Sequence, residues 1–183
     1  MRPLLRGRRL LLKPLAETDA PALFAAVEVS REVLRRRLRW ASGAVSAERS
    51  RGFIRAAAEA RGRGEREEFG VFEARTGALA GVVSLQGLLA VPGLAELSLC
   101  IRADRQGRGC GTEAARLLAA HAFLSDDLQK LYARLDPANR AARKVLQRAG
   151  FRYEGCLRHE KRLNGLWIDQ ECWGLLRAEW RHK

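Results

Sequence analysis

The spacing of apolar and polar residues predicts a domain in which strands and helices alternate. An opening strand at 8–15 (RRLLLKPL) is followed by a helix that Thr18 or Asp19 can cap and whose apolar run is 23–27. The Asn-Gly dipeptide at 164–165 predicts a two-residue turn between the last two strands. The other segments with regular periodicity are helices at 29–38, 47–61, 114–123 and 139–150, and strands at 69–73, 79–85, 95–101 and 130–135. Together they indicate an α/β (α+β) fold.

The segment between the strand at 95–101 and the helix at 114–123 carries the clearest chemical signal. Gln106, Gly109 and Gly111 stand in the order Q-x-x-G-x-G, and glycines let a backbone turn tightly with no Cβ in the way of a ligand. A helix that begins here offers unpaired N–H groups and the positive end of its dipole. The expected ligand is therefore a phosphate or pyrophosphate group.

Two other phosphate-binding motifs fit this segment less well. A P-loop requires Gly-Lys-Ser/Thr at a fixed spacing, which is absent. Gly109, Gly111 and Ala114 satisfy the dinucleotide motif G-x-G-x-x-A, and Asp136 ends the next strand. However, the polar residues 102–105 separate the strand from the glycines, and too little chain follows for the remaining βα units. A dinucleotide-binding oxidoreductase stays an alternative.

Composition narrows the class of protein. A chain of 183 residues with 47% hydrophobic content fits a single domain, 1–183. It contains no apolar run long enough to cross a bilayer and no signal peptide, so we expect a cytoplasmic protein. The net charge of +13 attracts polyanions, but the arginines are spread along the chain and often accompany glutamates on the predicted helices. Specific nucleic-acid binding is therefore not expected, and a basic ribosome-binding or nucleic-acid-binding module is kept as an alternative.

The chain has four cysteines, Cys100, Cys110, Cys156 and Cys172. They form no C-x-x-C pair, and three histidines accompany them, so we expect reduced thiols and no metal site. Across a regular two-residue hairpin, Cys156 would face Trp173 and Cys172 would face Leu157, and neither pair is a disulfide.

Two later motifs join the glycine-rich segment. Asn139 opens an N-x-x-A motif that leads to Gly150-Phe151, which indicates a helix capped by Asn139, closed by Gly150 and followed by a strand. The stretch 153–180 contains E-G-x-L-R, N-G-x-x-x-D and W-x-L-L-x-x-E-W in this order. With Q-x-x-G-x-G, these motifs resemble the GNAT superfamily of N-acetyltransferases, and in particular its branch of ribosomal-protein N-terminal acetyltransferases, the Rim type. The resemblance covers nearly the whole chain.

The resemblance implies a GNAT fold, with a mixed, twisted sheet of about seven strands flanked by about four helices, and acetyl-CoA as the cofactor. Backbone amides of the glycine-rich segment would bind its pyrophosphate, and N–H groups of the central strand would face the thioester oxygen. Basic residues in the helix after Asn139 could approach the phosphates. The residues implied for the cofactor are Leu99, Cys100, Ile101, Gln106, Gly107, Arg108, Gly109, Cys110, Gly111, Thr112, Asn139, Arg143 and Lys144.

Acetyl transfer also requires a group that deprotonates the amine. The resemblance places Glu96 of the central strand at the substrate groove, as the candidate base. It also implies that Trp40 helps to wall this groove. The carboxylate that the Rim type carries before the last turn would align with Glu160 or with the neighbouring Lys161, so Glu160 is the residue expected to contact the substrate.

The proton donor for the departing thiolate is where this chain departs from the family pattern. Many members carry Tyr seven residues after the motif asparagine, and the Rim type commonly carries Ser three residues after it; here these positions hold Leu146 and Ala142. Water, Ser98, Tyr132 or Tyr153 could supply the proton.

These residues predict an enzyme that transfers acetyl from acetyl-CoA to a primary amine by direct attack in a ternary complex, and the resemblance also implies a homodimer. A protein N-terminal α-amine is the first choice of acceptor, since about a third of it is neutral near pH 7.4, compared with about 0.1% of lysine. A small amine such as an antibiotic or a polyamine is an alternative acceptor. A ping-pong route through Cys110, a thiol at a helix N-terminus, is an alternative mechanism.

Overall fold

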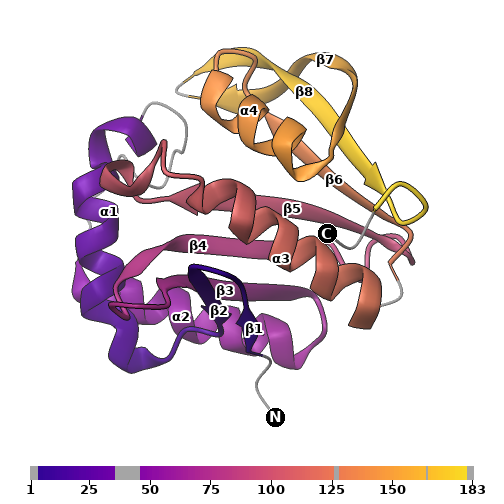
Figure 1. Ribbon diagram of the computed structural model, residues 1–183. Coiled ribbons are helices and arrows are strands. Elements are labelled where there is room, and N and C mark those ends of the chain that lie inside the picture. Colours follow the sequence, from indigo (N-terminus) through magenta and orange to yellow (C-terminus); the bar gives the residue numbers. More distant parts are fainter. Residues whose placement is uncertain (1–3, 36–45, 126–127, 164, 181–183) are drawn as a thin grey trace.

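The computed structural model describes residues 4–35, 46–125, 128–163 and 165–180. Within them, the chain forms one eight-stranded sheet in the order β1-β2-β3-β4-β5-β6-β8-β7, with helices on both faces (Figure 1). The strands are β1 (Leu5–Arg6), β2 (Leu10–Lys13), β3 (Arg66–Glu73), β4 (Leu79–Gln86), β5 (Leu94–Ile101), β6 (Lys130–Leu135), β7 (Arg152–Leu163) and β8 (Leu166–Leu176). The helices are α1 (Ala20–Arg35), α2 (Ala47–Gly62), α3 (Cys110–Ser125) and α4 (Arg140–Ala149), with short 3₁₀ turns η1 (Glu17–Asp19) and η3 (Ala103–Arg105).

This architecture confirms the predicted mixed sheet and its four flanking helices. The described residues contain eight strands instead of about seven, because the chain before β2 folds back on it. Leu5 pairs with Leu12 there, and Gly7 N–H donates to the carbonyl oxygen of Leu10 at 2.8 Å. Only two residues long, β1 gives no periodic pattern from which it could be predicted.

The beginning of α1 differs from its prediction. The helices expected at 23–27 and 29–38 form a single helix up to Arg35, and the remainder of the second prediction lies outside the described residues. No glycine or proline separates the two segments, so nothing ends the first helix. The predicted cap is also different: Asp19 closes η1 before α1, and its Oδ2 accepts a hydrogen bond from Ala16 N–H at 2.9 Å.

Two other helices begin and end where capping chemistry places them. Ser46 Oγ accepts a hydrogen bond from Arg49 N–H at 3.1 Å at the start of α2. At the start of α4, Asn139 Oδ1 accepts from Ala142 N–H at 3.2 Å, and Gly150, with φ of 104°, ends the helix. The predicted helix at 139–150 is confirmed.

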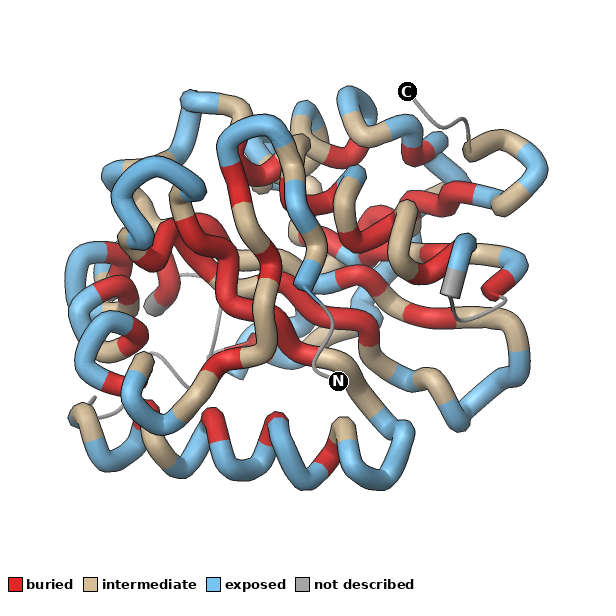
Figure 2. The backbone as a smooth tube through the Cα atoms, turned by 60° about the horizontal axis from the view of Figure 1, so that its bottom comes forward, coloured by how far each residue is buried: buried red, intermediate tan, exposed pale blue. Residues whose placement is uncertain are grey.

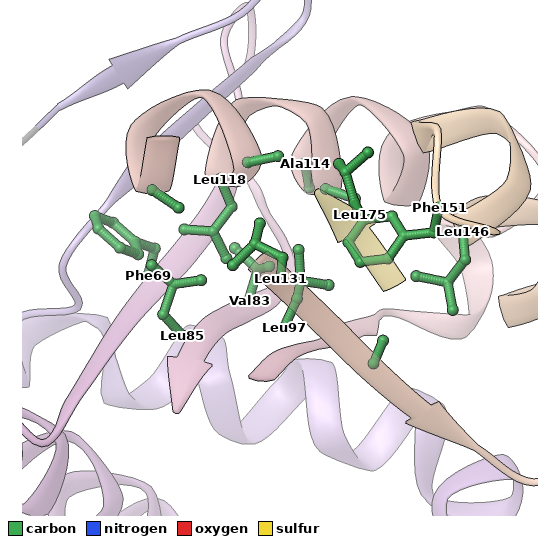
Figure 3. Packing of buried hydrophobic residues seen from close by; sticks show 14 of the residues in the cluster. Phe69, Val83, Leu85, Leu97, Ala114, Leu118, Leu131, Leu146, Phe151 and Leu175 are labelled. Carbon is green, nitrogen blue, oxygen red and sulfur yellow. The ribbon is translucent and has the colours of Figure 1, made fainter. Parts of the chain in front are cut away.

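Hydrophobic clusters on the two faces of the sheet hold the helices in place. Figure 3 shows Ala114 and Leu118 of α3 above Phe69, Leu97 and Leu131 of the sheet. On the other face, α1 and α2 pack on a smaller cluster whose members are Leu15, Ala20, Leu23, Ala26, Ile54, Phe72 and Leu79. The tube in Figure 2 is red mainly along the sheet and on the inner faces of the helices. Because full burial of a Leu or Phe side chain contributes about 1.5–3 kcal/mol, these clusters fix the sheet between two layers of helices.

The two central strands separate along their length. β5 and β6 are parallel, and their paired residues are Leu94 with Lys130, Ala95 with Leu131 and Glu96 with Tyr132. Beyond Glu96, β5 continues to Ile101 alongside β4, while β6 continues alongside β8. The strands visibly diverge in Figure 1. Backbone groups on one edge of β5, from Leu97 onward, therefore have no neighbouring strand.

The last hairpin has the predicted turn and an irregular ladder. Leu163 pairs with Leu166, which confirms a two-residue turn. The register then shifts twice, between Leu157 and Lys161 and again between Tyr153 and Gly155, so extra residues of β7 bulge out of the ladder. Regular alternation counted back from the turn cannot foresee such bulges.

The bulges overturn the predicted partners of two cysteines. Cys156 lies opposite Glu171, instead of Trp173. Cys172 lies opposite Gly155, instead of Leu157. All four cysteines belong to the described residues and are free thiols.

Candidate active site

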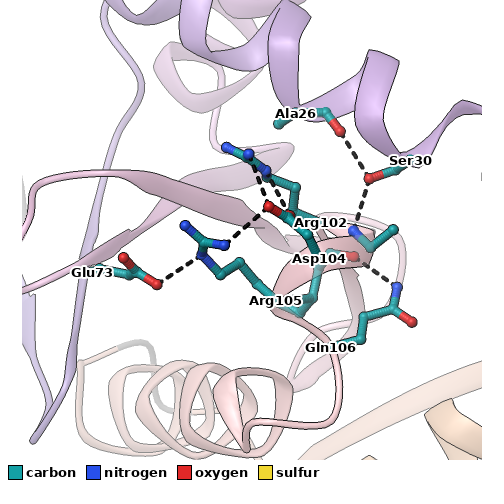
Figure 4. A network of polar contacts seen from close by, with 9 residues as sticks. Ala26, Ser30, Glu73, Arg102, Asp104, Arg105 and Gln106 are labelled. Carbon is teal, nitrogen blue, oxygen red and sulfur yellow. Dashed lines mark hydrogen bonds and ion pairs between the residues drawn. The ribbon is translucent and has the colours of Figure 1, made fainter.

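The segment between β5 and α3 is held by contacts with three other elements (Figure 4). Gln106 Nε2 donates a hydrogen bond at 2.9 Å to the last carbonyl group of β5. Arg105 Nε lies 2.9 Å from Glu73 Oε1 at the end of β3, and Ser30 Oγ of α1 accepts from Ala103 N–H at 3.0 Å. The protein's own contacts thus hold the loop, and the side chain of Gln106 makes one of them.

The start of α3 presents backbone donors. Gly107 and Gly109 have φ of 73° and 82°, in the left-handed region that favours glycine. The first hydrogen bond of the helical ladder runs from Glu113 N–H to the carbonyl oxygen of Gly109 at 3.1 Å. The helix therefore gives no i−4 partner to the amides of residues 110–112, which is the arrangement that binds phosphate groups.

Residues in the first turn of α3 determine how this helix packs against α4 and β2. A Cβ on Gly111 would lie 3.1 Å from Val145 Cγ2 of α4, so this glycine permits the close approach of α3 and α4. The Glu113 carboxylate accepts hydrogen bonds from the N–H groups of Arg9 and Leu10 at 2.7 and 3.1 Å, which ties β2 to α3.

The opening between β5 and β6 supplies further amides. Arg102 N–H donates to the carbonyl oxygen of Ala80 on β4 at 2.9 Å. Because N–H directions alternate along a strand, the amide of Cys100 also faces β4, whereas those of Leu99 and Ile101 face the opening. Of the three residues predicted to face the thioester oxygen, Leu99 and Ile101 are therefore oriented for it.

A cavity of about 450 Å³ lies on the opposite side of the sheet from α3, between β3, β4, β5 and helices α1 and α2. Its α1 wall is mostly apolar and includes Leu23, Ala26 and Val27, whereas its sheet side is mostly polar. The polar lining residues on the sheet are Arg66, Glu68, Ser84, Gln86, Ser98 and Cys100. The cavity also reaches Leu99, where the strands have parted, so a ligand in it can meet one in the opening.

Two rows of side chains cross the sheet on this face. Glu96 pairs with Tyr132 at the closed end of the opening. In the other row, Glu68 of β3 pairs with Ser84 of β4, which pairs with Ser98 of β5. The predicted base Glu96 and an unpredicted carboxylate, Glu68, therefore share one face.

Burial alters the acidity of three groups on this face. It raises the pKa of Glu68 to about 7, against the opposing charges of Arg66 and Arg61. Burial also raises the pKa of Glu96, while Arg134 and Lys161 act in the opposite direction. Burial and then the charge of Glu68 raise the pKa of Cys100 to about 11, so this thiol stays neutral.

Residues 9–152 match the acetyltransferase (GNAT) domain family. The chain belongs to this family. As a GNAT acetyltransferase, it uses acetyl-CoA as its acetyl donor, and the amides at the start of α3, together with the adjoining opening, suit the pyrophosphate and the thioester of that cofactor.

Relatives of this GNAT enzyme extend over nearly its whole length. It is 29% identical over 178 residues to YjcK, a probable N-acetyltransferase of Bacillus subtilis (strain 168), with 96% of this chain and 98% of YjcK covered. It is 26% identical over 158 residues to the ribosomal-protein-serine acetyltransferase of Escherichia coli (strain K12), with 86% and 87% covered. The structure of RimL, a ribosomal alpha-N-protein acetyltransferase, in complex with coenzyme A superposes with a TM-score of 0.88. That superposition covers 95% of this chain and 98% of RimL at 22% identity, and it confirms the predicted GNAT fold.

The predicted cofactor residues of α4 have other contacts. Arg143 Nη2 lies 2.5 Å from Glu171 Oε1 and donates to the carbonyl oxygen of Pro137 at 2.9 Å. Asn139 caps the helix. A role of Arg143, Lys144 or Asn139 in binding phosphate stays a prediction, and for Arg143 it would compete with Glu171.

The predicted catalytic and substrate residues are spread more widely. Ser98 lines the cavity, and Tyr132 lies beside Glu96. Tyr153 packs edge-on against Trp173, with ring centroids 5.6 Å apart, at the outer hairpin. Glu160 lies 3.7 Å from Arg134. Trp40 lies outside the described residues.

Glu68 is the functional candidate that sequence reasoning missed. The strand predicted at 69–73 begins only at Phe69, but β3 begins at Arg66 and so includes Glu68. The period of two that continues from Gly70 back to Glu68 was the available signal, because it places this carboxylate on the face of Phe72.

The described residues lack two further features. None of their groups of histidine, cysteine, aspartate and glutamate could hold a metal ion. None of their helices combines the length and the apolar character needed to cross a membrane.

Proposed function

We propose that this GNAT acetyltransferase transfers the acetyl group of acetyl-CoA to the N-terminal α-amine of a protein, by direct attack in a ternary complex. The supporting observation is that the acceptor cavity and the cofactor opening meet at Ser98 and Leu99. An amine in the cavity can reach a thioester in the opening without a covalent enzyme intermediate. Cys110, the alternative acyl carrier, is the first residue of α3, is 8% exposed and packs into the core, which speaks against the ping-pong route.

Backbone amides of the chain would bind the cofactor and polarise its thioester. Amides at the start of α3 hold the pyrophosphate, and the preformed loop before them limits the ordering cost of binding. The Leu99 amide points toward the thioester oxygen, where charge develops during attack. One such donor typically contributes 10²–10³-fold to kcat.

The cavity itself favours a peptide over a polycation. Its volume of about 450 Å³ is in the range of ligand-binding pockets and exceeds the needs of an amino group alone. Arg49, Arg66 and Arg102 line it together with one carboxylate, Glu68, and the whole chain carries a net charge of +13, so the net positive charge disfavours a polyamine. The ribosomal-protein-serine acetyltransferase relative adds support for an α-amine. The homodimer and the cytoplasmic location stay predictions of the family resemblance.

Thiol release from acetyl-CoA, measured with a panel of acceptors, tests this function. The panel pairs peptides that begin with Ser, Ala or Met with the same peptides blocked at the N-terminus and carrying an internal lysine, and adds a polyamine and an aminoglycoside. We expect turnover with free N-termini, and mass spectrometry should place the acetyl group on the α-amine.

Turnover confined to the polyamine or the aminoglycoside would replace the peptide with a small-molecule acceptor. Binding of acetyl-CoA without turnover of any amine would indicate a non-catalytic binding module on the same fold.

A further inference from the structure

Glu68 of β3 is a buried carboxylate aimed into the acceptor cavity. Its side chain is 7% exposed, and it lines the cavity opposite the apolar wall of α1. Burying an ionised group is costly unless it is well paired, and a buried carboxyl group that faces a cavity is a candidate functional residue.

The described partners satisfy this carboxylate poorly. Arg66 Nε lies 3.4 Å from Glu68 Oε2, yet that buried nitrogen makes no hydrogen bond within the described part of the chain. Arg61 of α2 donates to the backbone carbonyl oxygen of Glu68 at 3.0 Å. The carboxylate is therefore able to accept a hydrogen bond from a ligand in the cavity.

Other groups that face Glu68 come from each neighbouring element. Arg49 of α2 and Arg102 after β5 line the same cavity, and β5 contributes the neutral thiol of Cys100. Glu96 shares the face but does not line the cavity, and the α1 residues that do so are uncharged. The positive charges favour an ionised Glu68, so its elevated pKa results from burial beneath α1 and α2.

A polar path leads from Glu68 to the place where acetyl transfer would occur. Glu68, Ser84 and Ser98 are cross-strand neighbours on three adjacent strands, so the Cα atoms of Glu68 and Ser98 are roughly 10 Å apart. An ammonium group has three donors, and the carboxylate and the two hydroxyl groups offer acceptors along this row. An acceptor amine above Ser84 would lie between Glu68 and the opening at Leu99.

We infer that Glu68 takes up the proton of the acceptor's ammonium group, the role that the sequence predicts for Glu96. This inference rests on the proposed function, since it needs an amine acceptor. Ionised Glu68 accepts one proton from R–NH₃⁺, and the freed lone pair of the amine forms a bond to the carbonyl carbon of the thioester. The carbon–sulfur bond breaks, coenzyme A leaves as the thiolate, and the second proton of the amine passes to that thiolate through solvent.

The positions of the two carboxylates favour Glu68. Glu96 stands at the closed end of the opening beside Tyr132, and its electrostatic neighbours are Arg134 and Lys161, on the side of β6 and β7. Glu68 faces the cavity that leads into the opening, and its pKa of about 7 is near the value at which a general base works best at neutral pH.

The test compares kcat/KM for one peptide acceptor between pH 6 and 9 in the native enzyme, Glu68→Gln, Glu96→Gln and Glu65→Gln. Glu65 is an exposed residue paired with Arg63, so its variant controls for the loss of one negative charge. We expect kcat/KM of Glu68→Gln at pH 6.5 to be about 100-fold below that of the native enzyme, a typical value for general-base catalysis. At pH 9, the α-amine is already neutral and the loss should fall below about 10-fold. Glu96→Gln should change kcat/KM by a factor that does not vary with pH.

A second acceptor separates proton transfer from a structural role. A peptide that carries an aminooxyacetyl group at its N-terminus presents a nitrogen that is neutral throughout this pH range. Glu68→Gln should acetylate it with nearly native kcat/KM if Glu68 acts as the base, whereas a distorted cavity would impair both acceptors. Glu68→Asp keeps a carboxylate and should retain the native pH dependence with a lower kcat/KM.

Each outcome bears on the inference separately from the proposed function. If the native enzyme acetylates no peptide, the proposed function fails and this inference fails with it. If the native enzyme is active and Glu68→Gln shows a deficit independent of pH, or Glu96→Gln shows the pH-dependent one, only the inference is overturned. If Glu68→Gln does not fold, loss of the pH dependence in Glu68→Asp would likewise overturn it.

Discussion

At the scale of single residues, Glu68 connects the chemistry of the site with the stability of the fold. Its folded pKa of about 7 lies above the ordinary value of 4.5. The protonated group therefore stabilises the fold below pH 4.5, and this contribution is lost as pH rises through 7. Between pH 4.5 and 7, this difference in pKa corresponds to a change of about 3 kcal/mol in the free energy of unfolding.

Replacing Glu68 with Gln should remove the cost of burying an ionised carboxylate above pH 7. At pH 8, we expect the free energy of unfolding of Glu68→Gln to exceed that of the native protein by up to about 3 kcal/mol, because a buried carboxylate has become a neutral amide. At pH 4.5 or below, the two should be nearly equal. Urea unfolding at both pH values measures the difference, with Glu65→Gln as the control. Equal stability of Glu68→Gln and the native protein at pH 8 would show that the carboxylate is not desolvated.

At the scale of elements, the contact between α3 and α4 depends on Gly111. A Cβ at this position would lie 3.1 Å from Val145 Cγ2, closer than ordinary packing allows. We expect Gly111→Ala to lower the free energy of unfolding by about 1–3 kcal/mol, as overpacking usually does. It should also weaken coenzyme A binding, because the start of α3 moves. Chemical unfolding and calorimetric titration measure the two effects.

A matched pair of variants identifies the cause of that loss. Val145→Ala removes the methyl groups that the new Cβ would meet, so the double variant Gly111→Ala/Val145→Ala should recover part of the stability. Gly107→Ala is the control, because its φ is 73° and a Cβ there would meet nothing within 4 Å. The strain of Gly107→Ala comes from the backbone alone, so Val145→Ala should not relieve it. Recovery of Gly107→Ala by Val145→Ala would contradict this explanation.

Most of the helices and strands could be predicted from local patterns. The caps Asn139 and Gly150 and the Asn-Gly turn at 164–165 gave correct element ends, because each acts through neighbouring residues of the chain. The two-residue strand β1 is too short to show a periodic pattern, and the bulges of β7 interrupt the regular alternation counted from the turn, so local patterns predicted neither.

At the scale of the whole molecule, cofactor binding should stabilise the fold. The proposed cofactor site joins the start of α3 to the opening between β5 and β6, which only the folded chain assembles. At a coenzyme A concentration 100 times its Kd, the free energy of unfolding should rise by about 2.7 kcal/mol. A melting scan with and without coenzyme A measures this, with NADPH at the same concentration as the control. A shift with NADPH alone would instead favour the dinucleotide alternative.

The sequence by itself indicated the glycine-rich segment before α3, most of the strands and helices, and the family. These depend on local periodicity and on glycines at a fixed spacing, which short stretches of chain carry. Only the tertiary structure decided which residues meet in the cavity beneath α1 and α2. Glu68 and Ser98 are 30 positions apart in the chain and become neighbours through two steps of strand pairing. Because burial beneath α1 and α2 also sets the pKa of Glu68, its chemistry could not be read from the charged run in which it occurs.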